Sequence, residues 1–181
     1  MTENEHACLS LYDVSIPTFL RGLHTLKHLL VTATKHAQVT DISLQEIPSW
    51  SLYPDMKPLT FQVQVASNTG KKFIDRLTGQ EGPAFADDET TIEQLIERCQ
   101  HTIDRLQKVD RKTVDEAHVR NNTINLQLGD KAFNMTPQHY VLKFAVPNFF
   151  FHVQTAYSIL RMKGVPVGKM DYLSNFLAPD A

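Results

Sequence analysis

The stretch Phe144–Lys169, FAVPNFFFHVQTAYSILRMKGVPVGK, decides the fold because it combines a long apolar segment with two polar side chains four residues apart. Asn148 and His152 share one face of a helix, since residues i and i+4 are neighbours at 3.6 residues per turn. A buried polar group without a hydrogen bond costs about 1–3 kcal/mol. The sequence therefore predicts a long helix whose polar pair needs hydrogen-bond partners elsewhere in the fold.

Two earlier segments show the apolar spacing of helices. The first spans residues 19–37, and Ser15 with Pro17 forms a plausible start signal. The second runs from about Pro58 to Leu77 and ends before Gly79, because glycine tolerates the left-handed conformation that closes many helices.

A third helix and a β-hairpin precede the last helix. Thr90 and Glu93 form a capping-box signature before an apolar stripe from Ile92 to Leu106. Residues 123–135 alternate apolar and polar side chains around a Gly-Asp turn, which predicts a hairpin lying across one end of the bundle. Pro147 is expected to kink or split the last helix because proline removes a backbone hydrogen bond.

Composition limits the function classes. The chain has 181 residues, which fits one domain over residues 1–181. Its formal net charge of -2 gives no basic footprint for nucleic acid, and Lys71 with Lys72 is typical of a solvated helix face. No segment approaches the ~20 apolar residues of a membrane span and no signal peptide is visible, so we expect a cytoplasmic protein without a membrane partner. Cys8 and Cys99 form no CxxC pair, and Cys99 is expected to be a buried structural thiol.

Several polar residues are candidates for a site. Gln62 falls on the apolar side of the second helix, and His36 lies at the edge of the first apolar stripe, where it can face inward. Asp55 has two interpretations, of which the cap of the second helix is favoured over a carboxylate at the mouth of a pocket. Tyr53 and Tyr157 are secondary candidates at the rim of such a pocket.

Three strings carry a family resemblance: SLYDVSIPTFLRGL (residues 10–23), LYPDMKPLTFQVQVAS (52–67) and FAVPNFFFHVQTAYSILRMKGVPVGKMDYL (144–173). They resemble the DinB-like (YfiT-like) superfamily and, within it, an uncharacterised bacterial family. The resemblance spans almost the whole chain. It implies an all-α, DinB-like four-helix bundle with a small β-hairpin before the last long helix, usually assembled as a homodimer.

The resemblance also implies where a metal would bind. Many members of the superfamily hold a divalent metal with three histidines, one from the second helix and two from an HxxxH motif on the last helix. His152 matches the second histidine of that motif, but Asn148 replaces the first, and Gln62, or less plausibly Gln64, stands on the second helix. Neutral amides are poor ligands for zinc or nickel, although His36 could supply a second imidazole.

Three function classes follow. The first, which we favour, is a small-ligand-binding or structural bundle whose superfamily metal site is degenerate, with Gln62, Asn148 and His152 forming a polar cluster or lining a pocket. The second is a metal-dependent thiol transferase or hydrolase in which His152 binds zinc or nickel. The third is a dimeric interaction protein without a small-molecule site. The sequence identifies neither a substrate nor a reaction.

Overall fold

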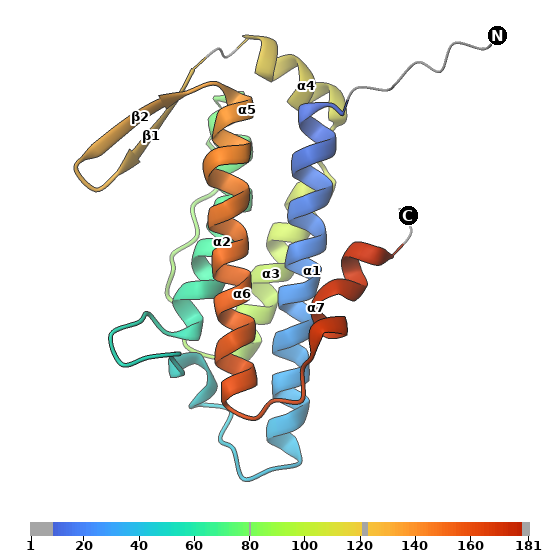
Figure 1. Cartoon of the computed structure of the whole chain (residues 1–181), viewed down its shortest axis with the longest axis vertical. Coiled ribbons are helices and arrows are strands. Elements are labelled where there is room, and N and C mark those ends of the chain that lie inside the picture. Colours follow the sequence, from blue (N-terminus) through green and yellow to red (C-terminus); the bar gives the residue numbers. More distant parts are fainter. Residues whose placement is uncertain (1–8, 80, 121–122, 179–181) are drawn as a thin grey trace, which may run out of the picture.

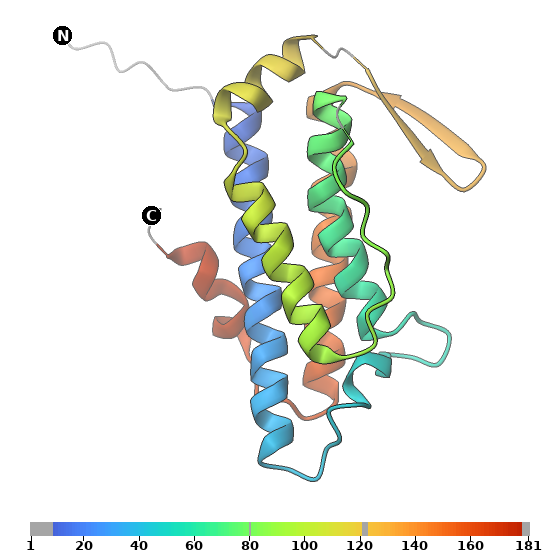
Figure 2. The same ribbon diagram turned by 180° about the vertical axis from the view of Figure 1, so that it is seen from behind.

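The computed structural model describes residues 9–79, 81–120 and 123–178. Four long helices pack side by side, and the fourth of them is assembled from two short segments and one long one (Figures 1 and 2). Their bounds are α1 (Leu11–Gln38), α2 (Leu59–Thr78), α3 (Ile92–Gln107), and α5 (Pro137–Tyr140) continued by a π-helical turn (Val141–Ala145) and by α6 (Val146–Met162). The bundle with a hairpin before its last helix confirms the expected fold class.

The direction of the helices follows from the connections. The segment between α2 and α3 runs back along the length of the bundle, so these two helices point the same way (Figure 2). Contacts between them agree with this direction, since Arg98 donates to the Gln64 carbonyl and Arg105 binds Asp75. The helices α1 and α6 run in the opposite direction, which makes the α2–α6 pair antiparallel.

An aromatic cluster lies at the centre of the core. The rings of Phe19 and Phe73 are 5.5 Å apart, and those of Phe19 and Phe149 are 5.2 Å apart at a steep angle, an edge-to-face arrangement that aromatic pairs prefer. Gly22 lets Phe149 approach α1, because a Cβ built on Gly22 would lie 2.2 Å from Phe149 Cε1. This close approach ties the last helix to the first.

Two predicted helix starts are wrong. The first helix begins at Leu11, where Ser10 and Asp13 form a reciprocal capping box, and Pro17 lies inside the helix. Ser15 is no cap; its hydroxyl donates to the Leu11 carbonyl at 2.6 Å. The buried side chain of Leu11 continues the apolar stripe upstream of Phe19 and explains the longer helix.

The start of α3 is displaced by one residue from the prediction. Thr91, rather than Thr90, is the N-cap, and its side-chain partner three residues later is Gln94 rather than Glu93. The Gln94 side chain accepts from both Thr90 N–H and Thr91 N–H, at 2.8 and 3.1 Å. Because the two threonines are adjacent, the sequence fits a capping box either as Thr90 with Glu93 or as Thr91 with Gln94. The structure has the second. The predicted end of α2 is correct, since Gly79 adopts a positive φ of 71°.

The hairpin before the last helix is confirmed. Strand β1 (Ile124–Leu128) pairs antiparallel with β2 (Lys131–Met135), and Gly129 in the turn has φ +57°. The predicted disturbance near Pro147 is also observed: the π-helical turn ends at Ala145, and α6 begins one residue before the proline. The helical conformation continues through Ala145, whose φ is -63° and ψ is -48°, so the proline does not split the helix; the missing N–H coincides with the change from the π-helical turn to α6.

Two helices were not predicted as such. Helix α4 (Arg111–Arg120) crosses the end of the bundle, and α7 (Lys169–Leu177) lies against α1 (Figure 1). In the segment of α7, the sequence indicated only an ordered cover over the bundle. Thr25 of α1 donates to the Tyr172 carbonyl at 3.1 Å, and His28 contacts Asp171 at 2.9 Å.

Two further expectations concern cysteine and membranes. Cys99 is buried in the core, and burial raises the pKa of its thiol to about 12, which fits a structural role. Cys8 lies outside the described residues. Among the described residues, no helix combines the length and apolar character needed to cross a bilayer.

Candidate functional site

Polar side chains join α2 to α6 at two levels. Nδ1 of His152 lies 2.7 Å from Oε1 of Gln62, and Asn148 donates its side-chain N–H to the Thr69 hydroxyl at 3.0 Å. On α2 the chain runs from Gln62 to Thr69, and on α6 it runs from Asn148 to His152. Gln62 pairs with His152 and Thr69 with Asn148, which is the order expected of antiparallel helices. The polar pair predicted on the last helix therefore does find partners, although Asn148 contacts Thr69 rather than Gln62.

The orientation of the Gln62 amide fixes the state of the imidazole. Its Nε2 donates to the backbone carbonyl of Lys57 at 2.8 Å, and a carbonyl can only accept a hydrogen bond. Oε1 must then face His152, so Nδ1 of His152 carries the proton and donates. In the neutral ring, Nε2 is left with a lone pair and acts as an acceptor.

His152 is neutral near pH 7 for a second reason. Burial lowers the pKa of its imidazole below the ordinary value of 6.5, because the charged ring would lose hydration. No acidic side chain contacts it in the described part of the chain; Gln62 is an uncharged partner. The amide and the burial therefore favour one neutral tautomer.

The second nitrogen of this ring has no partner in the described part of the protein. Nε2 of His152 makes no hydrogen bond to another described residue, and His152 as a whole is 8% exposed. Two aromatic rings flank the imidazole edge-on: Phe61 at 5.9 Å and Phe151 at 5.2 Å between centroids. Phe61 is 37% exposed and Phe151 is 60% exposed.

Phe61, Phe151 and Thr69 were not predicted as site residues. A signal for Thr69 was present, because it follows Gln62 at a spacing of seven residues, two helical turns, and so shares its face. Arg76 continues this spacing and donates to Tyr140 of α5 at 2.6 Å. The α2 face toward the last helix thus carries polar residues at regular intervals.

The other predicted site residues are not part of this arrangement. Asp55 is exposed and is not the cap of α2, since Pro58 occupies that position without a side-chain cap. Tyr53 is 66% exposed, and Tyr157 packs its ring against Tyr172 of α7 at 5.9 Å. His36 is half-buried near the end of α1, where its backbone carbonyl accepts hydrogen bonds from the turn that follows.

The donor set around His152 does not fit a transition-metal site. The Gln62 oxygen already accepts from the imidazole, and Asn148, whose side-chain N–H donates to Thr69, would offer only a neutral amide oxygen. Within the described residues, no three His, Cys, Asp or Glu side chains are grouped so that they could hold an ion. A zinc or nickel site generally needs three or four imidazole, thiolate or carboxylate ligands, and this cluster offers one imidazole nitrogen.

Comparisons with known proteins agree on the family. The model of a domain of unknown function, DUF1993, matches residues 11–173. The crystal structure of a DinB family member protein from Shewanella denitrificans is 32% identical and superposes with a TM-score of 0.80, covering 90% of this chain and 91% of that one. No curated protein matches the chain. The chain therefore belongs to the DUF1993 family, and its fold is that of the DinB family.

Proposed function

We propose that this protein binds a small molecule at His152, with Nε2 of the imidazole accepting a hydrogen bond from the ligand. One observation supports the proposal above the others: the Lys57 carbonyl holds the Gln62 amide, which in turn holds His152 Nδ1, and the neutral ring keeps an acceptor nitrogen without a partner among the described residues. An imidazole with both nitrogens bonded to the protein would offer a ligand no acceptor, whereas this ring keeps one.

The surroundings of the nitrogen indicate the kind of ligand. Phe61 and Phe151 flank the imidazole with partly exposed rings, which favour an apolar or aromatic ligand body. The neutral acceptor requires an O–H or N–H donor on that body. Ligands of this description include phenols and small aromatic amides, and pockets commonly combine such apolar walls with one oriented polar group.

The experiment compares two probes that differ in one hydrogen-bond donor. Phenol and anisole share a ring, but only phenol donates. We expect phenol to bind several-fold more tightly than anisole when each is titrated into the protein and followed by the NMR signals of Phe61 and Phe151. The expected ratio corresponds to a net hydrogen bond of about 1 kcal/mol.

Variants and pH separate this site from nonspecific binding. His152→Phe keeps a flat ring but removes the acceptor, so the preference for phenol should vanish, whereas His139→Gln, at an exposed position of α5, should preserve it. In the wild type, acidification below the pKa of His152 should also abolish the preference, because Nε2 then carries a proton. Equal affinities of phenol and anisole for the wild type at neutral pH would refute the proposal.

Self-association is a second candidate, favoured by apolar side chains on the outside of α6. Phe151 and Met162 are 60% and 49% exposed, and eleven residues place them on nearly the same helical face. A homodimer would cover this stripe. Light scattering should then give twice the monomer mass, and Phe151→Ser should return the monomer; a monomeric wild type at high concentration would contradict this candidate.

A further inference from the structure

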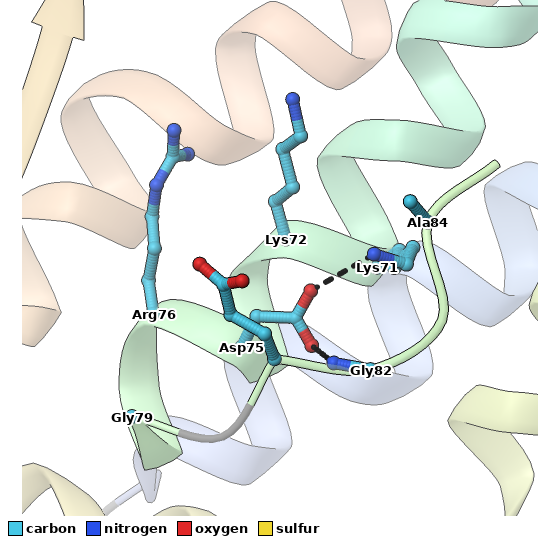
Figure 3. A pocket seen from close by; sticks show the side chains of 8 residues that line it. Lys71, Lys72, Asp75, Arg76, Gly79, Gly82 and Ala84 are labelled. Atoms are coloured by element: carbon cyan, nitrogen blue, oxygen red, sulfur yellow. Dashed lines mark hydrogen bonds and ion pairs between the residues drawn. The ribbon is translucent and has the colours of Figure 1, made fainter. Parts of the chain in front are cut away.

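A cavity lies at the far end of α2 from Gln62. It has a volume of about 460 Å³ and opens between the last turns of α2 and the segment that follows (Figure 3). It differs from the His152 site in character, since most of its polar lining is charged. The lining consists of Lys71, Lys72, Asp75, Arg76, Gly79, Glu81, Gly82 and Ala84.

Asp75 is fully engaged in this cavity. Its carboxylate accepts from Lys71 Nζ and from the Gly82 N–H, each at 3.1 Å, and it also binds the guanidinium of Arg105. The Asp75 and Lys71 side chains are 9% and 7% exposed. The interpretation of Lys71 as part of a solvated face is therefore wrong: its charge is used to neutralise a buried carboxylate.

Lys72 and Arg76 carry charges that no carboxylate of the described residues neutralises. Lys72 is exposed and has no ion pair in that part of the chain. Figure 3 shows both side chains projecting to the same side of α2, while Asp75 turns toward Lys71 and Gly82. Like charges four residues apart on a helix repel by a few tenths of a kcal/mol. An anion bound between Lys72 and Arg76 would replace this repulsion with attraction to both side chains.

Arg76 is held in place before any ligand binds. Its Nη1 donates to the phenol oxygen of Tyr140 at 2.6 Å, and its guanidinium lies over that ring, 5.3 Å from the centroid. Burial raises the pKa of Tyr140, so the phenol stays protonated at neutral pH. The remaining N–H donors of the guanidinium are then oriented by a rigid, buried partner, which lowers the entropy lost on binding.

The charge balance of the cavity is positive. Lys71, Lys72, Arg76 and the adjoining Arg105 face two carboxylates, Asp75 and Glu81. The end of α2 adds roughly half a negative charge at most, which is less than the excess of two cations. The rim is formed partly by Gly79, Gly82 and Ala84, so no large side chain closes the opening there.

We propose that this cavity binds a phosphate group, free or as the monoester of a small molecule, between Lys72 and Arg76. A planar guanidinium offers parallel donors to two phosphate oxygens, and a lysine supplies a compact charge beside it. The cavity exceeds the size of one phosphate ion, so it has room for a small organic group on the ester. This site is independent of His152, and its failure would leave the proposed function untouched.

The test is a calorimetric titration of the whole chain at low ionic strength with inorganic phosphate, glycerol 3-phosphate and glycerol. We expect both phosphates to bind and glycerol not to bind. Lys72→Gln should weaken binding about tenfold, whereas Lys35→Gln, at an exposed position of α1, should leave it unchanged. Tyr140→Phe removes the oxygen that positions Arg76 and should weaken binding by a smaller factor.

Glu81→Gln is expected to strengthen phosphate binding, an effect that a misfolded variant would not produce. Removing this carboxylate from the lining should tighten phosphate binding, since one repulsive charge disappears. Tighter binding of the ester than of inorganic phosphate would assign the cavity to a phosphorylated molecule, and equal affinities would assign it to the free ion. No binding of either phosphate to the wild type, or equal losses in Lys72→Gln and Lys35→Gln, would overturn the proposal.

Discussion

His152 and Gln62 face each other across the α2–α6 interface with Nδ1 and Oε1 2.7 Å apart, so an amide on one helix sets the tautomer of an imidazole on the other. The amide cannot rotate freely, because its nitrogen is held by the Lys57 carbonyl. In this arrangement the glutamine orients the imidazole, and Nε2 of the histidine keeps a lone pair that no described residue uses. The same amide would be a weak metal ligand.

The Gln62–His152 contact should appear as an energetic coupling. Gln62→Leu leaves Nδ1–H unpaired in a buried position and should destabilise the protein by about 1–3 kcal/mol, as should His152→Phe. Together they should cost less than the sum, with a coupling of roughly 1 kcal/mol or more in urea unfolding. The exposed pair Gln154 and Ser158 serves as control, and its coupling should be near zero. Additive losses at Gln62 and His152 would contradict the contact.

Stability should fall as pH decreases below about 6.5. Burial lowers the pKa of His152 in the folded protein, so between the two pKa values the unfolded chain binds a proton that the folded chain does not. His152→Phe should therefore lose less Tm than the wild type between about pH 7.5 and pH 5.5. His139→Gln, at an exposed position, should follow the wild type. Identical pH profiles for the wild type and His152→Phe would remove the buried neutral imidazole from the account.

Metal analysis should find far less than one equivalent. Protein purified without an affinity tag and titrated with zinc, nickel and manganese should show no tight site at His152, because the Gln62 oxygen already accepts a hydrogen bond and Asn148 offers only a neutral amide oxygen. His152→Ala should leave the metal content unchanged. About one equivalent that disappears in this variant would restore the metal-dependent transferase or hydrolase alternative.

Two glycines should respond to alanine with opposite signs. In Gly22→Ala the new Cβ would meet Phe149 Cε1 at 2.2 Å, and this buried ring has no room to retreat, so we expect a loss of about 1–3 kcal/mol. In Gly70→Ala the nearest atom, Leu106 Cδ1, is 3.5 Å away, so the higher helix propensity of alanine should add up to about 1 kcal/mol. Chemical denaturation of both variants measures the difference, and a neutral Gly22→Ala would contradict the close packing of α1 and α6.

Apolar periodicity predicted the long helices because it records which face is buried, but it did not locate their ends. Ser10 and Ser15 are both residue types that cap helices. The helix begins after Ser10, where Asp13 completes the capping box and Leu11 is buried. Helix α4 was missed because its sequence carries little apolar periodicity; of its side chains that the structure describes, only Val114 is buried.

The candidate site was predicted in part. The spacing of Asn148 and His152 indicated one polar face, and Gln62 was correctly chosen as a partner for it. That Asn148 meets Thr69 instead depends on the register of two antiparallel helices, which the spacing within each helix does not determine. The exposure of Phe151 was equally beyond reach, because an apolar run of three phenylalanines does not tell which ring faces outward.

The tautomer of His152 is the most direct test of the proposed site. A long-range ¹H–¹⁵N correlation spectrum of histidine-labelled protein at neutral pH, assigned with His152→Phe, reports the protonation of each ring nitrogen. We expect a protonated, pyrrole-like Nδ1 and an unprotonated, pyridine-like Nε2 whose signal shifts when phenol is added. A proton on Nε2, in the other tautomer or in the imidazolium, would leave no acceptor for a ligand and would contradict the proposed function.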